Sequence, residues 1–491
     1  MMLRLESLMR ACCTNTRGFA LCALVLLCAF ALPLWLGLGT DPTGRISEQR
    51  CVLVVKGMVE SGDWLVPRLD DIIRLQKPPL FYWAGASVAT FVHDTHPWSV
   101  RAVSACAALG LAAVVLAWGR SLGGPAFGLI AVGVLVAMQQ ITSSGRRGDA
   151  EMLLALLSTA ALFAFDRADS RRPRPPLAPF ALLAGLAFLT KGTAIAFSIA
   201  APIAVQLALR RELRVLLERR VLVCFAAIAA IGLSWYVAVL VSVPGALTSF
   251  LDALMLPLGS QESRSGSAHY KPFWWFLVAL PVRAAPASLL LPFVIWQLWR
   301  TRLYRDDPRR RFAALAFLAP FVAFSALPQK QKHYTLSMLP GLALCSADAV
   351  IAAARELWPR FSLALRALGA PLAALGAAVV VWCALFYVWV ESLAPATAIA
   401  AAVLPLALFT LAGLAALGAR PALFGAAWIV AFLLALAVGR GLVEPRLEYY
   451  AANYRQLPIG EQEQLVYASR QHPWFAKQLF ALLDAVGDDD N

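Results

Sequence analysis

The sequence predicts an all-α polytopic membrane protein, and two observations carry that prediction. Hydrophobic residues make up 60% of the 491 residues and charged residues only 15%, whereas a soluble domain has about 45–50% and about 25%. The apolar residues are also gathered into runs of about 20, the length that a helix needs to cross a bilayer. This composition excludes a disordered chain, a collagen-like fibre and an ordinary soluble enzyme.

About 13 apolar runs follow one another along the chain, and each is expected to form a transmembrane helix. The first has a basic stretch before it but no small-residue cleavage site after it, so we expect a membrane anchor rather than a signal peptide. The expected spans are residues 18–39, 101–118, 125–142, 150–165, 177–190, 193–209, 221–243, 273–298, 312–327, 333–353, 367–390, 395–417 and 421–441.

The basic residues predict the orientation of these spans. If the N-terminus lies in the cytoplasm, the cytoplasmic loops receive most of the arginines, including the cluster at residues 300–311, as the positive-inside rule requires. We therefore expect a multi-pass protein of the cell inner (plasma) membrane, with a cytoplasmic N-terminus and an outer C-terminus. The net charge of +14 belongs to these loops, so membrane lipids rather than nucleic acid are the expected partners. The nine cysteines include no Cys-x-x-Cys pair and predict neither a disulfide framework nor a zinc site.

Two segments on the outer side differ from the helices. The first outer loop, residues 40–100, is too long for a simple connection, and it has an amphipathic pattern around 48–60 followed by a turn at Ser61-Gly62-Asp63. The second is a polar tail, residues 442–491, which leaves residues 1–441 as the predicted transmembrane domain. Because long loops on a rigid helical scaffold commonly carry function, we expect the active site on this outer side.

Charged residues at the outer ends of the helices predict the chemistry. Carboxylates beside lysine, arginine and tyrosine at the boundary between water and lipid are typical of a site where a phosphate-bearing lipid is attacked. The cations hold the phosphate, and a carboxylate accepts a proton from the attacking group. Each residue also has a simpler interpretation. Arg146 and Arg147 could anchor lipid headgroups, Asp149 could cap the helix that follows it, and Lys77 could belong to a helix start at an aromatic belt.

Six short motifs occur in order over roughly residues 40–345. They are Ser61–Pro67, Lys77–Trp83, Gly148–Met152, Thr190–Gly192, His269 ahead of Pro272–Trp275, and Lys332–Leu336. In this order they resemble the bacterial 4-amino-4-deoxy-L-arabinose lipid A transferases, which belong to the protein-mannosyltransferase-like superfamily of GT-C glycosyltransferases. The topology of that family, with 13 spans, agrees with the one counted above.

The resemblance implies a GT-C fold and transfer of a sugar from a polyprenyl phosphate, undecaprenyl phosphate in a bacterium. The acceptor would be lipid A, another glycolipid, a glycan or a protein on the outer face of the membrane. The residues implied to bind the phosphate or substrate are Lys77, Arg50, Tyr334, Lys332, Tyr82, His269 and Lys191. Asp149 falls on the aspartate of the family's second outer loop, and His269 on a histidine that can ligate a metal.

The chain departs from the family at the presumed base. The family's Asp-Glu pair falls on Ser47-Glu48 here, so the aspartate is replaced by serine. Three residues are therefore candidates: Glu48, Asp41 carried in by a rearranged loop, and Asp149. Glu48 is favoured because it keeps Arg50 in register.

A second departure is Gln76, which stands where the lipid A enzymes have a metal-ligating glutamate. A neutral amide is a poor ligand for a divalent cation, and only His269 would remain, so no metal and no other cofactor is predicted. Two other functions stay open. A transporter or flippase would need ionisable residues buried in mid-span and symmetry-related broken helices. A non-catalytic relative that binds the carrier lipid is favoured by Ser47 and Gln76.

Overall fold

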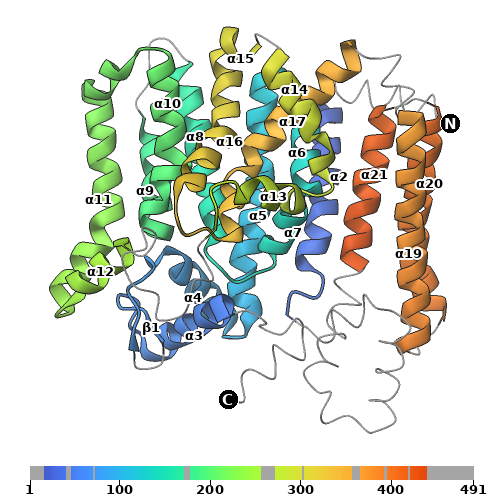
Figure 1. The fold of residues 1–491 in the computed structure, drawn as a ribbon. Coiled ribbons are helices and arrows are strands. Elements are labelled where there is room, and N and C mark those ends of the chain that lie inside the picture. Colours follow the sequence, from blue (N-terminus) through green and yellow to red (C-terminus); the bar gives the residue numbers. More distant parts are fainter. Residues whose placement is uncertain are drawn as a thin grey trace. The chain divides into compact units, whose positions relative to one another are not determined.

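The computed structural model describes residues 16–39, 46–69, 72–170, 177–255, 271–300, 303–356, 365–391, 395–418 and 421–438, and it is helical almost throughout (Figure 1). Asp41, His269 and the tail at 442–491 lie outside these residues. The chain divides into two compact units. Of the described residues, the smaller unit contains 28–39, 46–49 and those from 365 onward, and the larger contains 16–27 and 50–356.

Helices form most of the larger unit. Their bounds are α4 (Leu80–Val92), α5 (Pro97–Gly123), α6 (Pro125–Ala137), α7 (Gln139–Gly145), α8 (Glu151–Asp169), α9 (Ala178–Lys191), α10 (Ala201–Leu209), α11 (Arg219–Ser242), α12 (Ala246–Met255), α13 (Trp275–Arg283), α14 (Leu291–Arg300), α15 (Leu303–Asp306), α16 (Pro308–Ala326) and α17 (Leu339–Glu356). Two further helices, α2 (Thr16–Trp35) and α3 (Ile46–Ser61), have residues in both units. Short helical turns include η1 (Gly192–Ala194), η2 (Ala196–Ala200), η3 (Leu213–Leu217), η5 (Ala287–Leu290) and η6 (Lys332–Ser337).

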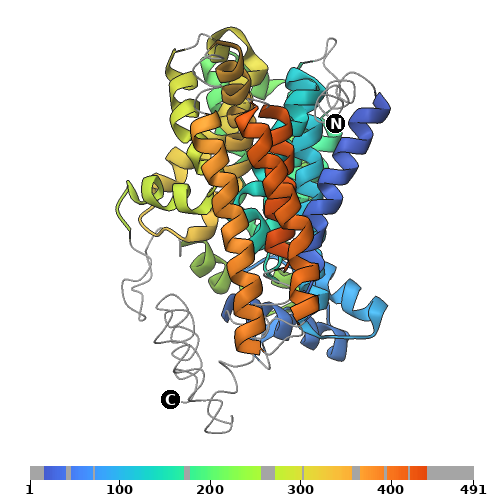
Figure 2. The same cartoon turned by 90° about the vertical axis from the view of Figure 1, so that its right-hand side faces the viewer.

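The smaller unit contains α19 (Ala370–Glu391), α20 (Pro395–Leu417) and α21 (Pro421–Val438), which run side by side after the turn η7 (Leu365–Gly369) (Figure 2). Small buried residues line their contact, namely Ala373, Ala412 and Ala427. Alanine and glycine at such contacts let helix backbones approach closely, which is how helices associate where no water drives them together.

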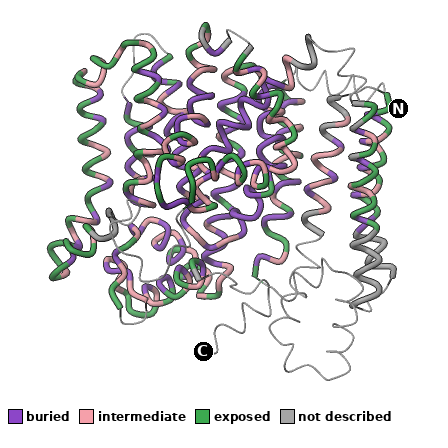
Figure 3. The backbone as a smooth tube through the Cα atoms, viewed as in Figure 1, coloured by how far each residue is buried: buried purple, intermediate pink, exposed green. Residues whose placement is uncertain are grey.

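Three described helices are long and apolar enough to cross a membrane, namely α2, α5 and α11, and up to six spans result if each of three bent pairs counts as one. Only 22% of the apolar window of α11 is buried, against 67% for α5, a contrast visible along the two helices in Figure 3. A helix that exposes large apolar side chains such as Val223 and Val241 is suited to contact with lipid. The chain is a multi-pass membrane protein.

The bent pairs differ from the straight spans expected from the sequence. The segments Ala178–Ala194 and Ala196–Leu209 meet at 115°, and the expected span at 273–298 consists of α13 and a second short segment at 118° to it. The number of 13 spans therefore stays a prediction. An apolar run indicates burial in lipid, but it does not indicate the direction in which the helix continues.

Side-chain bonds to the backbone hold the turn that follows α3. Asp63 accepts the backbone N–H groups of Leu65 and Val66, each at 3.1 Å, which is the bonding pattern that aspartate favours in turns. Two indole N–H groups bind the same segment from outside, because Trp83 donates to the carbonyl of Trp64 at 2.7 Å and Trp235 to that of Leu65 at 2.8 Å. The motif Ser61–Pro67 is therefore a fixed structure against α4 and α11.

The rest of the first outer loop packs on α3. A two-stranded antiparallel hairpin, β1 (Arg68–Leu69) and β2 (Ile72–Ile73), follows the turn; the sequence did not indicate it. The helix α4 then buries its apolar face against α3, where Phe81 and Ala86 share one core with Val55 and Met58. This packing determines where the segment just before α4, which contains Lys77, lies.

The opposite end of the larger unit is tied together at the start of α16. The carboxylate of Asp307 caps the helix by accepting the backbone N–H groups of Arg309 at 2.9 Å and Arg310 at 3.2 Å. The Arg309 guanidinium pairs with Asp166 of α8 at 2.6 Å and donates to the carbonyl of Ser121 of α5 at 2.8 Å. One arginine thus joins three helices.

The next two arginines bind two further helices. Arg310 pairs with Asp348 of α17. Arg311 donates through Nε to the side-chain oxygen of Gln206 of α10 at 2.9 Å. These arginines were expected only as part of a basic loop, but the structure places them in α16 with specific partners.

Removing the Arg309 side chain should destabilise the larger unit. Asp166 is only 4% exposed, and a buried carboxylate left without its partner costs about 3 kcal/mol. We expect Arg309→Met to lower the thermal unfolding midpoint of the purified chain in detergent. The matched control is Arg219→Met, at an exposed position at the start of α11, which should leave the midpoint unchanged. Equal midpoints for the two variants would contradict this account of the ion pair.

Candidate functional site

Glu151, the first residue of α8, lies at the centre of a charged cluster in the larger unit. Its side chain is 8% exposed, and its two carboxylate oxygens lie 2.5 and 2.7 Å from Nζ of Lys191 at the end of α9. The imidazole Nε2 of His333 lies 3.3 Å from the Glu151 carboxylate and 3.1 Å from Lys191 Nζ. Residues from three segments far apart in the sequence therefore share one buried carboxylate.

Gly192 explains the sharp turn that places Lys191. Its φ of +53° is in the left-handed region that glycine adopts readily. A Cβ atom at this position would lie 2.9 Å from the Tyr236 hydroxyl of α11 and 3.9 Å from Pro78. The turn therefore needs glycine twice, for its conformation and for space. It brings the Thr190–Gly192 motif against the Lys77–Trp83 motif.

Asp149 lies in the loop between α7 and α8. Its Oδ1 accepts the backbone N–H of Glu151 at 3.2 Å, so the simpler interpretation of this residue, a hydrogen bond to the start of a helix, applies in part. Burial and the negative charge of Glu151 raise the pKa of Asp149 to about 6, although Lys77 and Arg147 partly offset them. A carboxyl group that titrates near neutral pH is suited to general acid–base chemistry.

Lys77 lies close enough to this cluster to interact electrostatically with its carboxylates. Burial alone lowers the pKa of the Lys77 ammonium, but the anionic forms of Cys51, Glu151, Tyr82 and Asp149 outweigh burial, and the pKa lies above its usual value. Lys77 therefore stays charged at neutral pH. It forms no ion pair with any carboxylate in the part of the chain that the structure describes.

Tyr82 lies beside Lys77 at the start of α4. Its ring is 2% exposed and belongs to the core shared by α3 and α4. Burial raises the pKa of its hydroxyl, which also takes part in a hydrogen bond with the Arg74 side chain. Packing therefore fixes the ring, and its hydroxyl already has a partner.

Tyr334 reaches the cluster from η6. Its ring stacks on Phe324 at a centroid distance of 4.9 Å, and Lys191 Nζ lies 5.4 Å from the centre of the Tyr334 ring, within the range of a cation–π contact. Gln140 of α7 holds the segment, because its side chain accepts from Thr335 at 2.5 Å and donates to the carbonyl of Lys332 at 3.4 Å.

The structure brings together some of the expected site residues and not others. Lys191 and Asp149 contact Glu151 directly, and Lys77 and Tyr334 lie close enough to Glu151 to interact with its charge. Tyr82 interacts with Lys77 in the same way. Two of the expected side chains are exposed, those of Arg50 on α3 and Lys332 on η6. Glu48, in the first turn of α3, is 4% exposed and belongs to the smaller unit.

Two residues of the cluster were not expected as site residues, Glu151 and His333. Both lie inside motifs that the sequence already indicated, Gly148–Met152 and Lys332–Leu336. A glutamate in the first turn of a helix is typically a partner of the helix dipole, so the sequence did not distinguish Glu151 from that role. The distinguishing signal is Lys191, 40 positions later.

No group of three or more His, Cys, Asp or Glu residues in the described ranges is placed to hold a metal ion. Gln76, which replaces the expected glutamate, is neutral and exposed. Within the described ranges, which do not include His269, the side chains thus do not make up a ligand set, and the proposed mechanism uses no metal.

Comparison with known proteins gives two kinds of match. The family model described as dolichyl-phosphate-mannose-protein mannosyltransferase matches residues 76–240. A relative from Shewanella sediminis, an undecaprenyl phosphate-alpha-4-amino-4-deoxy-L-arabinose arabinosyl transferase, is 28% identical over 65% of this chain and 58% of its own. A second transferase of that name, from Proteus mirabilis, is 26% identical over 70% of this chain and 62% of its own. The chain thus spans less than two thirds of the length of these relatives.

The fold is also similar to solved structures. ArnT from Cupriavidus metallidurans bound to undecaprenyl phosphate has a TM-score of 0.67 and 20% identity, covering 89% of this chain and 81% of that one. The apo form of the same protein gives a TM-score of 0.63 and 19% identity. At this identity the likeness concerns the fold. The chain is therefore similar in fold to ArnT, and similar in sequence over part of its length to the arabinosyl transferases named above.

Proposed function

We propose that this protein is a membrane glycosyltransferase that moves a sugar from a polyprenyl phosphate carrier to an acceptor on the outer face of the membrane. The observation that carries the proposal is the position of Lys77, an ammonium ion without a carboxylate partner among the described residues, beside Asp149, a carboxyl with a pKa of about 6. The first can bind a phosphate and the second can accept a proton. The acceptor class is lipid A, another glycolipid, a glycan or a protein.

Lys77 is the better candidate for the phosphate than Lys191. Lys191 is neutralised by Glu151 at 2.5 Å, so binding a phosphate there would have to compete with a buried ion pair. Lys77 can give its full charge to the ligand, and an ammonium group binds phosphate strongly as a point charge. The Tyr334 hydroxyl, from the segment packed on Lys191, is proposed as a second donor to the phosphate.

Asp149 is the base that the geometry supports best. The acceptor hydroxyl transfers its proton to the Asp149 carboxylate as its oxygen attacks the anomeric carbon. The bond from that carbon to the phosphate oxygen breaks, and polyprenyl phosphate departs with the electron pair, stabilised by Lys77. Glu48, which the family register favours, is the alternative base, and the experiments below distinguish the two.

Replacing Lys77 should weaken binding of the carrier. We expect Lys77→Met to reduce retention of undecaprenyl phosphate by the purified chain at least tenfold, because the phosphate loses its cation. The control is Lys56→Met on α3, whose side chain is 51% exposed and whose loss changes the net charge equally. Native mass spectrometry with added undecaprenyl phosphate measures both. Retention by Lys77→Met at the wild-type level would overturn the phosphate assignment.

The reaction rate should depend on pH through Asp149. The carboxylate form of Asp149 is the base, and its pKa is about 6. The rate should therefore rise with pH and level off above about pH 7. At pH 5 it should be about tenfold lower than at this plateau. Initial rates in membranes at pH 5–8 measure this profile. Asp149→Asn should lose most activity, and its residual rate should lack the rise. If Glu48→Gln instead abolishes the rise while Asp149→Asn retains it, Glu48 is the base.

Glu151→Gln should move that rise to lower pH. The negative charge of Glu151 raises the pKa of Asp149, so its removal favours the Asp149 carboxylate. The same pH series on the variant is the measurement. A rise that stays at the wild-type pH, or moves upward, would contradict the electrostatic coupling described here.

A further inference from the structure

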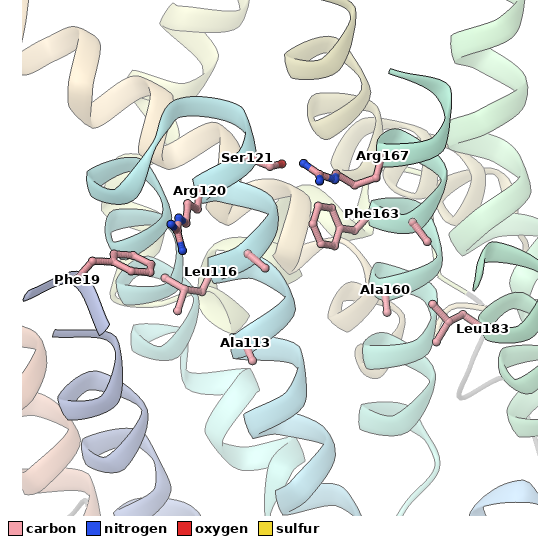
Figure 4. A pocket seen from close by; sticks show the side chains of 11 residues that line it. Phe19, Ala113, Leu116, Arg120, Ser121, Ala160, Phe163, Arg167 and Leu183 are labelled. Carbon is pink, nitrogen blue, oxygen red and sulfur yellow. The ribbon is translucent and has the colours of Figure 1, made fainter. Parts of the chain in front are cut away.

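A groove of about 720 Å³ lies at the far end of α5 and α8 from the candidate site (Figure 4). Residues of α2, α5, α8 and α9 line it. The distance from Glu151 to Arg167 is 16 residues of α8, about 24 Å along the helix axis. The groove is therefore separate from the cluster around Glu151, and its volume is in the range of ligand sites.

The walls of the groove are apolar. Ala113 and Ala117 lie one turn apart on α5, and Ala160 and Ala164 lie one turn apart on α8, so in each helix two small side chains share one face. Larger apolar side chains, such as Phe163 and Leu183, border the space (Figure 4). A groove of this kind can take a hydrocarbon chain, whose burial is favourable and needs no polar partner.

Arginines line one end of the groove. Arg120 is in the last turn of α5 and Arg167 in the last turn of α8, and both are exposed. The Arg120 guanidinium lies 4.7 Å from the centre of the Phe19 ring. Neither arginine forms an ion pair with a carboxylate within the described ranges.

The carboxylates nearest in sequence are already engaged elsewhere. Asp166 binds Arg309, and Asp169 binds Arg210. Two guanidinium groups thus lie at an apolar groove without a carboxylate partner among the described residues, while Arg210 and Arg309 each have one. The sequence before Thr16 is itself basic, with Arg4 and Arg10 against one acidic residue, Glu6.

We propose that this groove binds an anionic glycerophospholipid. The acyl chain lies along the alanine faces of α5 and α8, and the headgroup phosphate lies at the end that carries Arg120 and Arg167. Guanidinium groups bind phosphate through paired N–H donors, and basic pockets between transmembrane helices on the cytoplasmic side hold lipid headgroups. On the orientation expected from the basic residues, the lipid comes from the cytoplasmic leaflet.

The test compares two lipids with the same acyl chains, phosphatidylglycerol and phosphatidylcholine, added to the delipidated full-length chain. Native mass spectrometry should show one retained phosphatidylglycerol at about tenfold lower lipid concentration than phosphatidylcholine, and phosphatidylglycerol should raise the unfolding temperature. Arg120→Gln with Arg167→Gln should abolish the preference. The matched control, Arg214→Gln with Arg219→Gln, removes the same charge from exposed positions at η3 and α11 and should keep it.

A second variant tests the groove without changing charge. Ala117→Phe adds a ring to an exposed groove position, and we expect it to reduce lipid retention while the unfolding temperature of the lipid-free chain stays the same. Undiminished retention in Ala117→Phe, or equal losses in the two double-arginine variants, would overturn the proposal in favour of unspecific attraction. If the chain retains phosphatidylglycerol only after residues 1–15 are deleted, the N-terminal segment is the occupant of the groove. That result would also overturn the proposal.

Discussion

The ion pair between Glu151 and Lys191 is the interaction on which the candidate site depends. A carboxylate on a side chain that is 8% exposed is costly to bury unless it is paired and hydrogen-bonded. The start of α8, the end of α9 and η6 must therefore meet where Lys191 and His333 can reach it. The charge of Glu151 then acts on its neighbours, raising the pKa of Asp149 and helping to keep Lys77 protonated. One buried carboxylate therefore determines both the position and the protonation of the groups proposed to act on the substrates.

Charges at the other end of the bundle follow the same rule. Asp166 and Asp348 are buried and each is paired with an arginine from the start of α16, so α8 is held by an ion pair near each of its ends. The cations without carboxylate partners among the described residues, such as Lys77 and Arg167, lie where a ligand could bind. Paired charges thus account for the assembly of the helices, and these remaining cations account for the two proposed binding sites, one for a carrier phosphate and one for a membrane lipid.

Much of the fold could be predicted from the sequence, and the site only in part. Apolar runs indicated the helices, and the pattern at 48–60 with Ser61-Gly62-Asp63 indicated α3 and its end. The 115° bend after α9 was not predictable, because it depends on how Gly192 packs against Tyr236 of another helix. Glu151 was missed for a similar reason, since a glutamate at a helix start has a common local role until Lys191 is seen opposite it in space.

Mass spectrometry of total lipids and surface glycans from a null strain, with and without the wild-type gene, tests the central claim most directly. Transfer from a polyprenyl phosphate predicts that the null strain accumulates a lipid-linked sugar and that one glycolipid, glycan or protein loses the mass of that sugar, with both changes reversed by the gene. If neither mass changes while the protein is expressed in the complemented strain, the transferase account is contradicted, and a transporter or a non-catalytic carrier-binding protein becomes the better description.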